Sequence, residues 1–281
     1  MLGSVYAMVA VALTLSIGIL RFLNFSIPGL FMIGAMATWA LVHRAIPWPL
    51  AAGAALLIGA AASLLVEFFT WRRMRMVEHF VPLVSSMAFL ILFEHLAIVF
   101  WGSELRTLPA LFGNADWRVG GLVIGLPQLM ALISSMALIF ILTQLLARTR
   151  LGRALRTIAE DSDTALLLGI DIGRIVPVVF VMSGLFAAFA GVVFALNYRQ
   201  VHPFMGEMVG LKAISAMIVG GMGNVWGSIA GGVIIGMVEV MSIGYFGADF
   251  VDIAVYGLLL LILFIRPTGL FTGGLVGHAR L

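Results

Sequence analysis

The sequence predicts an all-α fold, a polytopic bundle of about eight or nine transmembrane segments in a single domain over residues 1–281. Hydrophobic residues make up 62% of the chain and charged residues only 10%, whereas soluble domains average about 45–50% and about 25%. The apolar residues also gather in runs close to the roughly 20 residues that a helix needs to cross a bilayer. This composition excludes an ordinary soluble domain, a disordered chain and a nucleic-acid-binding protein.

Nine apolar runs are candidate spans, and three of them are short or interrupted. The first has about 16 residues, fewer than a full span needs. The second opens with Pro28-Gly29, and the seventh ends in the glycine-rich stretch 220–224, which does not continue a helix comfortably. We therefore expect broken or re-entrant helices at these places. The nine runs are 5–20, 28–43, 49–70, 80–101, 119–147, 175–197, 209–222, 225–244 and 249–266.

The basic residues predict the orientation of the bundle. If all nine runs cross and the C-terminus lies inside, eleven of the sixteen basic residues fall on the inner side. The positive-inside rule then favours a cytoplasmic C-terminus and an N-terminus on the opposite side. The eleven are Arg21, Arg72, Arg73, Arg75, Arg148, Arg150, Arg153, Arg156, Arg174, Arg266 and Arg280, and the other five are Arg44, Arg106, Arg118, Arg199 and Lys212.

Residues 148–174 are the polar exception in the chain. Apolar residues recur there near helical spacing, while Arg153, Arg156 and Glu160 fall on the opposite side. The pattern predicts a helix–turn–helix with one apolar face. On the orientation above, this segment is cytoplasmic.

Capping residues mark the ends of these two expected helices. The acidic stretch 160–163 is suited to starting the second helix, and Gly169 and Gly173 are suited to ending helices. An apolar face this short forms no core alone, so either a lipid surface or a protein covers it. Anionic lipid would repel the acidic stretch, which favours docking to a cytoplasmic protein.

The same segment carries a resemblance to a known family. It reads GRALRTIAED over residues 152–161, followed by Ala165 and Gly169-Ile170. This pattern resembles the coupling loop of ABC importer permeases, and most closely that of the branched-chain amino-acid permease family. The residues that the resemblance assigns to ATPase coupling are Gly152, Arg153, Arg156, Ala159, Glu160, Asp161, Ala165, Gly169 and Ile170.

Three further stretches resemble motifs of that family, and they follow the family's order along almost the whole chain. They are residues 6–15 with Asn24-Phe25, residues 210–213 with residues 220–224, and residues 266–271.

The resemblance implies both a role and partners. Two permease subunits would form the pathway, two ABC ATPase subunits would drive it, and an extracytoplasmic binding protein would deliver the solute. The chain would be a multi-pass protein of a bacterial plasma (inner) membrane that imports branched-chain or related amino acids by alternating access. Whether the permease pair is homodimeric or heterodimeric stays open.

The sequence predicts neither an enzyme nor a cofactor. It contains no G-x-x-x-x-G-K-[ST] phosphate loop, which agrees with ATP hydrolysis on separate partner subunits. It has no cysteine and its five histidines are dispersed, so we expect no metal site.

One departure from the family concerns the solute. After Asn24-Phe25 the family usually has a small residue, then His-Gly and often an acid, whereas this chain reads Ser26-Ile27-Pro28-Gly29. The solute therefore stays open among branched-chain amino acids, urea, short amides and aromatic acids.

Candidate pathway residues lie where runs break or where a charge interrupts them. Asn24 and Ser26 mark the first break, where they either bind a solute or cap the flanking helices. Glu94 lies in the middle of the fourth run, where it either lines the pathway or pairs with His95 or a neighbouring helix. Glu239 is expected between helices. The pathway candidates are Asn24, Ser26, Glu94, Gly220, Gly221 and Asn224.

An alternative function also fits the composition. An ion-coupled secondary transporter of a small polar solute would use Glu94 or Asp252 as a proton or sodium site. A membrane-embedded enzyme fits less well, because no catalytic constellation can be recognised.

Overall fold

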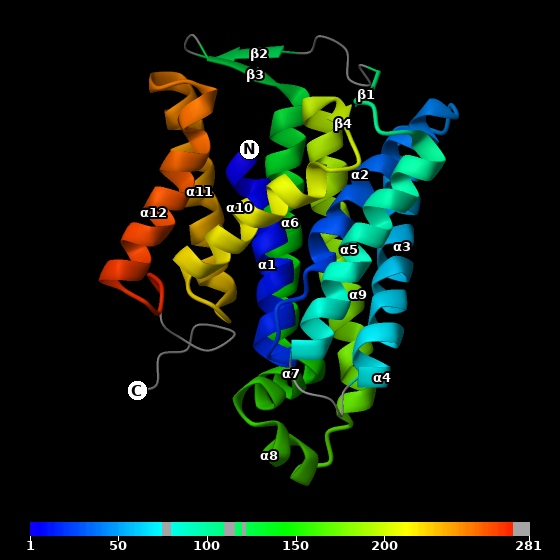
Figure 1. Ribbon diagram of the computed structural model, residues 1–281, viewed down its shortest axis with the longest axis vertical. Coiled ribbons are helices and arrows are strands. Elements are labelled where there is room, and N and C mark those ends of the chain that lie inside the picture. Colours follow the sequence, from blue (N-terminus) through cyan, green and yellow to red (C-terminus); the bar gives the residue numbers. More distant parts are fainter. Residues whose placement is uncertain (75–79, 110–115, 120–121, 272–281) are drawn as a thin grey trace.

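The computed structural model describes residues 1–74, 80–109, 116–119 and 122–271. Most of its helices run along the long axis of the molecule, with two short β ribbons at one end and α7 and α8 at the other (Figure 1). The elements are α1 (Leu2–Leu20), α2 (Ser26–His43), α3 (Trp48–Val66), the π-helix η1 (Glu67–Trp71), α4 (Arg72–Met74), α5 (Phe80–Trp101), β1 (Arg106–Thr107), β2 (Asp116–Val119), β3 (Leu122–Gly125), α6 (Leu126–Arg148), α7 (Arg150–Glu160), α8 (Ser162–Leu167), α9 (Ile172–Tyr198), β4 (Gln200–Val201), α10 (Met205–Gly220), α11 (Val225–Tyr245), the 3₁₀-helix η2 (Ala248–Phe250) and α12 (Val251–Ile265).

The all-α membrane bundle predicted from composition is confirmed. Within the described residues, eight helices have the length and the composition of a membrane span. The seventh predicted run forms α10, which has only 16 residues. At about 1.5 Å per residue, α10 is about 24 Å long and falls short of the roughly 30 Å hydrocarbon core. The expectation of a shortened helix ending at the glycine-rich stretch therefore holds. For the first two runs the expectation of a short or broken helix is wrong, because α1 has 19 residues and is a candidate span, and α2 continues without a break through Pro28-Gly29.

The run predicted over 119–147 is not one helix. Asp116–Val119 and Leu122–Gly125 form an antiparallel hairpin, and α6 starts only at Leu126. Pro127 lies in the first turn of α6, where its missing N–H costs nothing. The predicted run had about 29 residues. Its first residues belong to the hairpin, and the remaining helix α6, with 23 residues, is still long enough to span the membrane.

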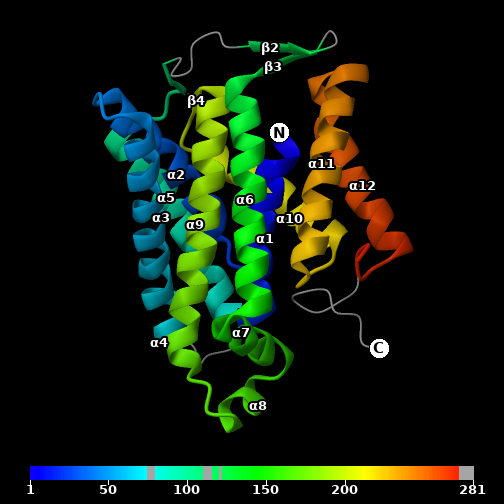
Figure 2. The ribbon, with the colours of Figure 1, turned by 180° about the vertical axis from the view of Figure 1, so that it is seen from behind.

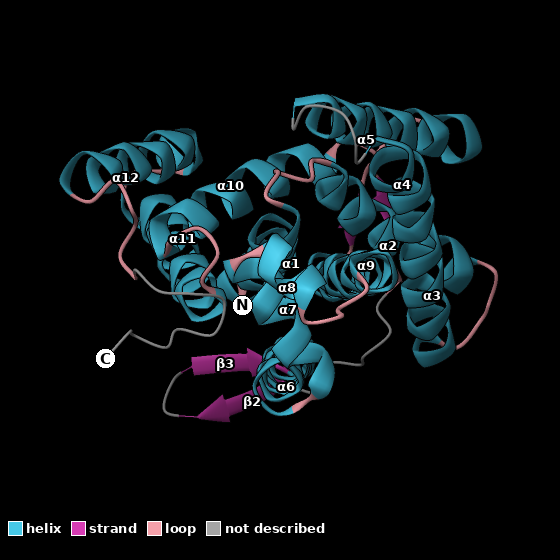
Figure 3. Ribbon diagram, turned by 90° about the horizontal axis from the view of Figure 1, so that it is seen from below, coloured by secondary structure: helices cyan, strands magenta, loops and turns pink. Residues whose placement is uncertain are grey.

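The helices divide into an inner and an outer group. The spanning windows of α1, α2 and α9 are 72%, 78% and 72% buried, whereas those of α5 and α12 are 22% and 17% buried. Seen along the bundle, α1 and α9 lie inside, with α12, α5, α3 and α6 around them (Figure 3). The outer helices expose large apolar side chains such as Phe264 and Val99, as lipid-facing helices do.

Helices α1 and α11 pack through small residues. A side chain at Gly232 would lie 2.4 Å from the Ala7 backbone, and one at Gly236 would lie 2.3 Å from the Gly3 backbone. The two backbones therefore touch, as expected for small residues spaced four apart. The close contact places Glu239, which lies about one turn beyond Gly236 on α11, next to α1.

The two ends of the bundle differ in character. The β1–β4 ribbon pairs Arg106 with Val201 and Thr107 with Gln200 at one end, while α7, α8 and the start of α9 lie at the other (Figure 2). Successive long helices alternate in direction along the long axis (Figures 1 and 2). Of the predicted inner-side basic residues, Arg75 and Arg280 lie outside the described part of the chain.

Candidate functional site

The polar segment after α6 forms the helix–turn–helix that the sequence predicts. Thr149 ends α6 and caps α7, because its side-chain oxygen accepts a hydrogen bond from the Gly152 N–H at 3.0 Å. Any side chain at Gly152 would lie 2.1 Å from the Leu146 carbonyl oxygen. Glycine at this position therefore lets α7 turn back closely against the end of α6.

The second helix, α8, begins at an aspartate cap. One carboxylate oxygen of Asp161 accepts a hydrogen bond from the Asp163 N–H at 3.0 Å, and the other accepts from the Thr164 hydroxyl at 2.5 Å. These two hydrogen bonds lower the pKa of the Asp161 carboxyl, the Thr164 bond having the larger effect. The prediction of an acidic cap for this helix is confirmed.

Gly169 ends the second helix in a left-handed conformation, with φ of 78°, while the next backbone N–H, from Ile170, bonds back to the Ala165 carbonyl at 3.0 Å. The second expected stop is wrong, because Gly173 lies inside the first turn of α9. Helix α9 starts at Ile172 and continues through Gly173 without interruption.

The loop has a buried face and an exposed tip. Leu155, Ile158 and Ala165 are buried, and the Arg21 guanidinium at the end of α1 donates a hydrogen bond to the Glu160 carbonyl oxygen at 3.2 Å. The stretch 166–168, three consecutive leucines, is exposed, with Leu167 89% exposed. Of the predicted coupling residues, Arg153, Glu160, Asp161 and Gly169 are exposed, Arg156, Ala159 and Ile170 are half-buried, and Gly152 and Ala165 are buried.

At the first break, Asn24 and Ser26 are both buried. The Asn24 amide oxygen accepts hydrogen bonds from the Ser26 N–H at 3.1 Å and from the Ser26 hydroxyl at 2.6 Å. The Ser86 hydroxyl on α5 accepts from the Phe25 N–H at 3.0 Å. Neither residue holds a cap position, because the C-cap of α1 is Arg21 and the N-cap of α2 is Phe25, but the Asn24 side chain satisfies the N–H of Ser26 at the buried first turn of α2.

Glu94 is 5% exposed, and its Oε1 atom has no hydrogen-bond partner among the described residues. His95 does not pair with it, because the His95 ring lies against the Ile91 carbonyl oxygen at 2.9 Å. Glu94 lies within electrostatic range of His95 and of Glu207, which is in the first turn of α10. Two carboxylates from different helices thus approach each other near the start of α2.

The glycine-rich turn between α10 and α11 is held by the C-terminal motif. The Leu270 and Phe271 N–H groups donate to the carbonyl oxygens of Val219 and Gly220 at 2.9 and 3.1 Å. These bonds satisfy the free carbonyl groups at the end of α10. Two of the family motifs therefore meet in space, although about 50 residues separate them.

The six pathway candidates fall into two places. Pro28, beside the first break, lies against Gly206 and Gly210 near the start of α10. Gly220 lies 14 residues beyond Gly206, which is about 21 Å along a helix. Asn24, Ser26 and Glu94 therefore lie near one end of α10, while Gly220, Gly221 and Asn224 lie at its other end, where Asn224 caps α11.

The structure also reveals a charged cluster that the list of pathway candidates lacked. The Glu239 carboxylate accepts hydrogen bonds from the Tyr6 hydroxyl at 2.6 Å and from the Lys212 ammonium at 2.8 Å. Lys212 also lies 3.8 Å from Asp252. The expected interhelical role of Glu239 is confirmed. Lys212, the chain's only lysine, was a sequence signal for this cluster, because it interrupts an apolar stretch.

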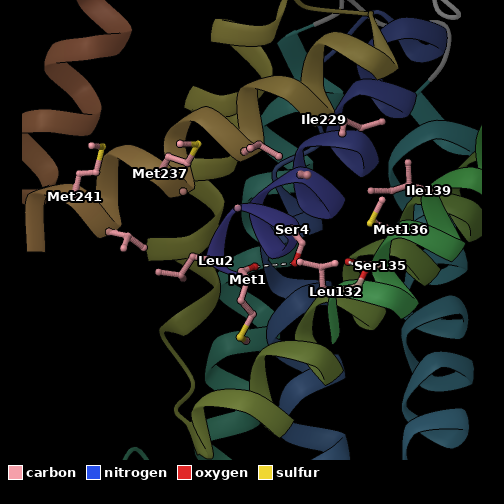
Figure 4. Close-up of a pocket in the computed structure, with 15 residues that line it drawn as sticks. Met1, Leu2, Ser4, Leu132, Ser135, Met136, Ile139, Ile229, Met237 and Met241 are labelled. Atoms are coloured by element: carbon pink, nitrogen blue, oxygen red, sulfur yellow. Dashed lines mark hydrogen bonds between the residues drawn. The ribbon is translucent and has the colours of Figure 1, made fainter. Parts of the chain in front are cut away.

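A separate hollow of about 530 Å³ lies between α1, α6 and α11 (Figure 4). Met136, Ile139, Met237 and Met241 are among the side chains around it, and Ser4 donates a hydrogen bond to the Met1 carbonyl oxygen at 2.7 Å. The lining is almost entirely apolar and offers few groups to recognise a polar solute. We therefore exclude this hollow from the candidate pathway.

Residues 1–265 match the family model described as the permease component of branched-chain amino acid transport systems. The chain is 30% identical to the high-affinity branched-chain amino acid transport system permease protein BraD of Pseudomonas aeruginosa, over 95% of this chain and 92% of that protein. It is 31% identical to the corresponding permease protein LivH of Escherichia coli strain K12, over 96% and 92%. A ribose import permease, RbsC of Bacillus subtilis, is 27% identical over 64% of this chain and 58% of that protein. No solved structure matches.

The matches to this family and to its members agree with the membrane-spanning helices that the structure shows. The family match covers every spanning helix, and the relatives match over nearly their whole length. The chain is thus a multi-pass membrane protein, and the ATPase of such a transporter is a separate subunit. It belongs to the branched-chain amino acid ABC permease family and is the permease component of such a transport system.

Proposed function

We propose that this permease imports a branched-chain or related amino acid into the cytoplasm, and that the α7–α8 loop receives the motion of the ATPase. The observation that carries the proposal is the loop's shape. Two capped helices present an exposed leucine tip, residues 166–168, beside the exposed acids Glu160 and Asp161. Anionic lipid would repel these acids, whereas a protein surface accommodates both the leucines and the carboxylates.

The loop is connected to the centre of the bundle. Helix α7 contacts α1, α6 and α9, and α1 in turn contacts α10 and α11. Arg21, at the end of α1, donates to the backbone of Glu160. A push on α7 therefore reaches α1 directly, and through it the short helix α10. We propose that this chain of contacts changes the angle between the helices of the pathway and so produces alternating access.

The proposed pathway uses the start of α2. Helix α2 begins inside the bundle at buried Ser26, and the N-terminus of a helix favours an anionic group such as a solute carboxylate. Glu94 offers an unpaired buried oxygen on the neighbouring helix α5. These groups suit a polar solute that carries both charges, and Asn24 and Ser26 keep the site in shape.

The remaining partners follow from the family. We propose two ABC ATPase subunits at the α7–α8 end, a second permease subunit in the bilayer, and a solute-binding protein at the opposite end. In this orientation the last described residues, which contact the α10–α11 turn, face the cytoplasm in a bacterial inner membrane. The excess of arginine at that end supports this orientation.

The coupling role is tested in proteoliposomes that contain the complete transporter. Leu167→Asp and Glu160→Ala each alter the loop's exposed surface without touching its buried face, so we expect correct insertion and assembly. ATP-dependent uptake of labelled leucine should fall at least tenfold in the double variant, with ATP hydrolysis no longer linked to uptake. Arg73→Gln is the matched control, because this exposed arginine of α4 lies toward the same end but outside residues 148–174. Normal coupled uptake in the double variant would overturn the docking role.

A further inference from the structure

A cavity of about 250 Å³ lies between α1, α9, α10 and α11, apart from the start of α2. Its charged and polar groups come from Tyr6, Tyr198, His202, Lys212 and Glu239, and the remaining lining is apolar. The volume equals about eight water molecules, which suits a small solute. The apolar lining consists of Leu2, Phe194, Met205, Met208, Val209 and Ile243.

The charges in this cavity are paired but not saturated. Each Glu239 oxygen accepts one hydrogen bond within the described structure, from Tyr6 and from Lys212 respectively. A carboxylate accepts about four, and an ammonium has three N–H donors. The described contacts of the Lys212 ammonium are Glu239 at 2.8 Å and Asp252 at 3.8 Å. Donors and acceptors therefore remain for a ligand while the ion pair stays intact.

Helix packing alone does not account for this pair. The pair joins α10 to α11, and these helices already touch through glycines: a side chain at Gly231 would lie 2.0 Å from the Ala216 carbonyl oxygen, and one at Gly227 would lie 2.3 Å from that of Gly220. A charged pair in an apolar bundle is costly to keep, and apolar residues often replace such a pair without loss of stability. We therefore look for a functional role for the buried Lys212–Glu239 pair.

We propose that this cavity binds an amino acid by its zwitterionic head group. The solute ammonium donates to the Glu239 carboxylate and to the Tyr6 oxygen, and the solute carboxylate accepts from the Lys212 ammonium. The solute's branched side chain lies against the methionines and Phe194, where burial of apolar surface favours it. This inference rests on the proposed function, and it adds a binding site to the proposed pathway.

His202, at the edge of the cavity, adds no competing charge. Burial lowers the pKa of the His202 imidazole, so the ring is neutral at pH 7. Within the described lining the charged groups are then Lys212 and Glu239, which cancel, whereas Asp252 lies outside the lining with its side chain 67% exposed. A neutral zwitterion therefore matches this site better than an ion with a net charge.

The cavity and the first break lie on different faces of α10. At about 100° per residue, Met205, Met208 and Lys212 fall on one face. Gly206 and Gly210, which contact Pro28, fall on another. Helix α10 therefore separates the two sites, and a solute held in the cavity passes α10 to reach the start of α2.

The experiment compares uptake by the complete transporter in proteoliposomes with uptake by the variant Lys212→Met/Glu239→Met. This double change removes both charges and keeps apolar side chains of similar length, so the bundle stays folded. We expect ATP-dependent leucine uptake to fall at least tenfold while the variant still assembles into the transporter. Thr14→Val is the matched control, because it removes a hydrogen bond between α1 and α11 outside the cavity lining and should leave uptake unchanged.

Head-group recognition is tested on the purified complex without its binding protein. Leucine should raise the Tm, whereas leucinamide, which lacks the carboxylate, and 4-methylpentanoate, which lacks the ammonium, should not. If the double variant fails to assemble, Met208→Trp takes its place. Met208 lines the cavity but is 63% exposed, so the fold accommodates a larger side chain there, and the indole ring fills the cavity. We expect the same tenfold loss.

The outcomes separate the two proposals. If the unaltered transporter takes up leucine and the assembled double variant, or Met208→Trp in its place, does so equally well, the cavity inference is wrong and the proposed function stands. Equal stabilisation by leucine and leucinamide would also overturn the cavity inference. If the unaltered transporter takes up no branched-chain amino acid, the proposed function and the inference fail together.

Discussion

The α7–α8 loop and the Tyr6–Lys212–Glu239 cluster hold many of the chain's few charges, yet they use them in opposite ways. In the loop, the carboxylates and most of the arginines are exposed, and the side-chain hydrogen bonds are mostly to neighbouring backbone groups. In the cluster, one acid and one lysine from different helices form a buried pair, with side chains only 10% and 14% exposed. Water screens the first set of charges, and only the protein stabilises the second.

The exposure of the charges determines how each region should respond to substitution. An exposed charge contributes little to stability, so the loop is free to present its charges to a partner surface. A buried charge is costly unless it is paired, so the cluster's geometry is tightly constrained. We therefore expect substitutions in the loop to change coupling and those in the cluster to change folding, binding or both.

The largest effect is expected from breaking the buried pair on one side only. Lys212→Met leaves the Glu239 carboxylate buried with Tyr6 as its remaining described donor, which should destabilise the subunit by about 3–5 kcal/mol. Unfolding of the purified subunit in detergent micelles measures this change. Arg153→Met, at an exposed position in α7, should leave the unfolding transition unchanged. A comparable loss from both variants would show that burial does not separate the two regions.

Much of the fold was predictable, because a membrane requires long apolar helices. The α7 and α8 boundaries were also predictable, since Asp161 and Gly169 are local signals that need no tertiary contact. The Lys212–Glu239 pair was not, because the two residues are 27 positions apart and only the crossing of α10 and α11 brings them together. The His95 ring contacts the Ile91 carbonyl oxygen rather than the Glu94 carboxylate, because adjacent residues on a helix do not face each other.

A smaller effect is expected from removing a single hydroxyl. Tyr6→Phe deprives the Glu239 carboxylate of its 2.6 Å hydrogen bond, and hydrogen bonds to charged groups contribute about 1.5–3 kcal/mol. Thr157→Val removes a hydroxyl in the loop that donates to the Arg153 carbonyl at 3.1 Å, and it should cost less than about 0.5 kcal/mol. Unfolding in detergent compares the two variants. Equal losses would contradict the contrast between the regions.

A glycine exchange tests the loop's backbone rather than its charges. Gly169→Ala forces alanine into a left-handed conformation, which should cost about 1 kcal/mol locally even though the position is sterically open. Gly53→Ala in α3 is also sterically open but has no positive φ, so it should be neutral or slightly stabilising. Hydrogen exchange should show faster opening of α8 in the first variant only. Unchanged exchange there would mean that Gly169 does not set the end of α8.

The smallest effect concerns the Asp161 cap and its pH dependence. Its hydrogen bonds to Thr164 and to the Asp163 N–H lower its pKa below the usual value of about 3.9. A group with a lowered folded-state pKa stabilises the fold above its unfolded pKa, and this contribution is lost as the pH falls through the folded pKa. Protection of the α8 amide groups should therefore hold at neutral pH and decline only at strongly acid pH. Asp161→Asn keeps an acceptor for the cap but cannot titrate, so its amide protection should not change over that range. If both proteins lose protection at the same pH, the titration belongs to neighbouring carboxylates such as Asp163, and the cap's charge has no part in holding α8.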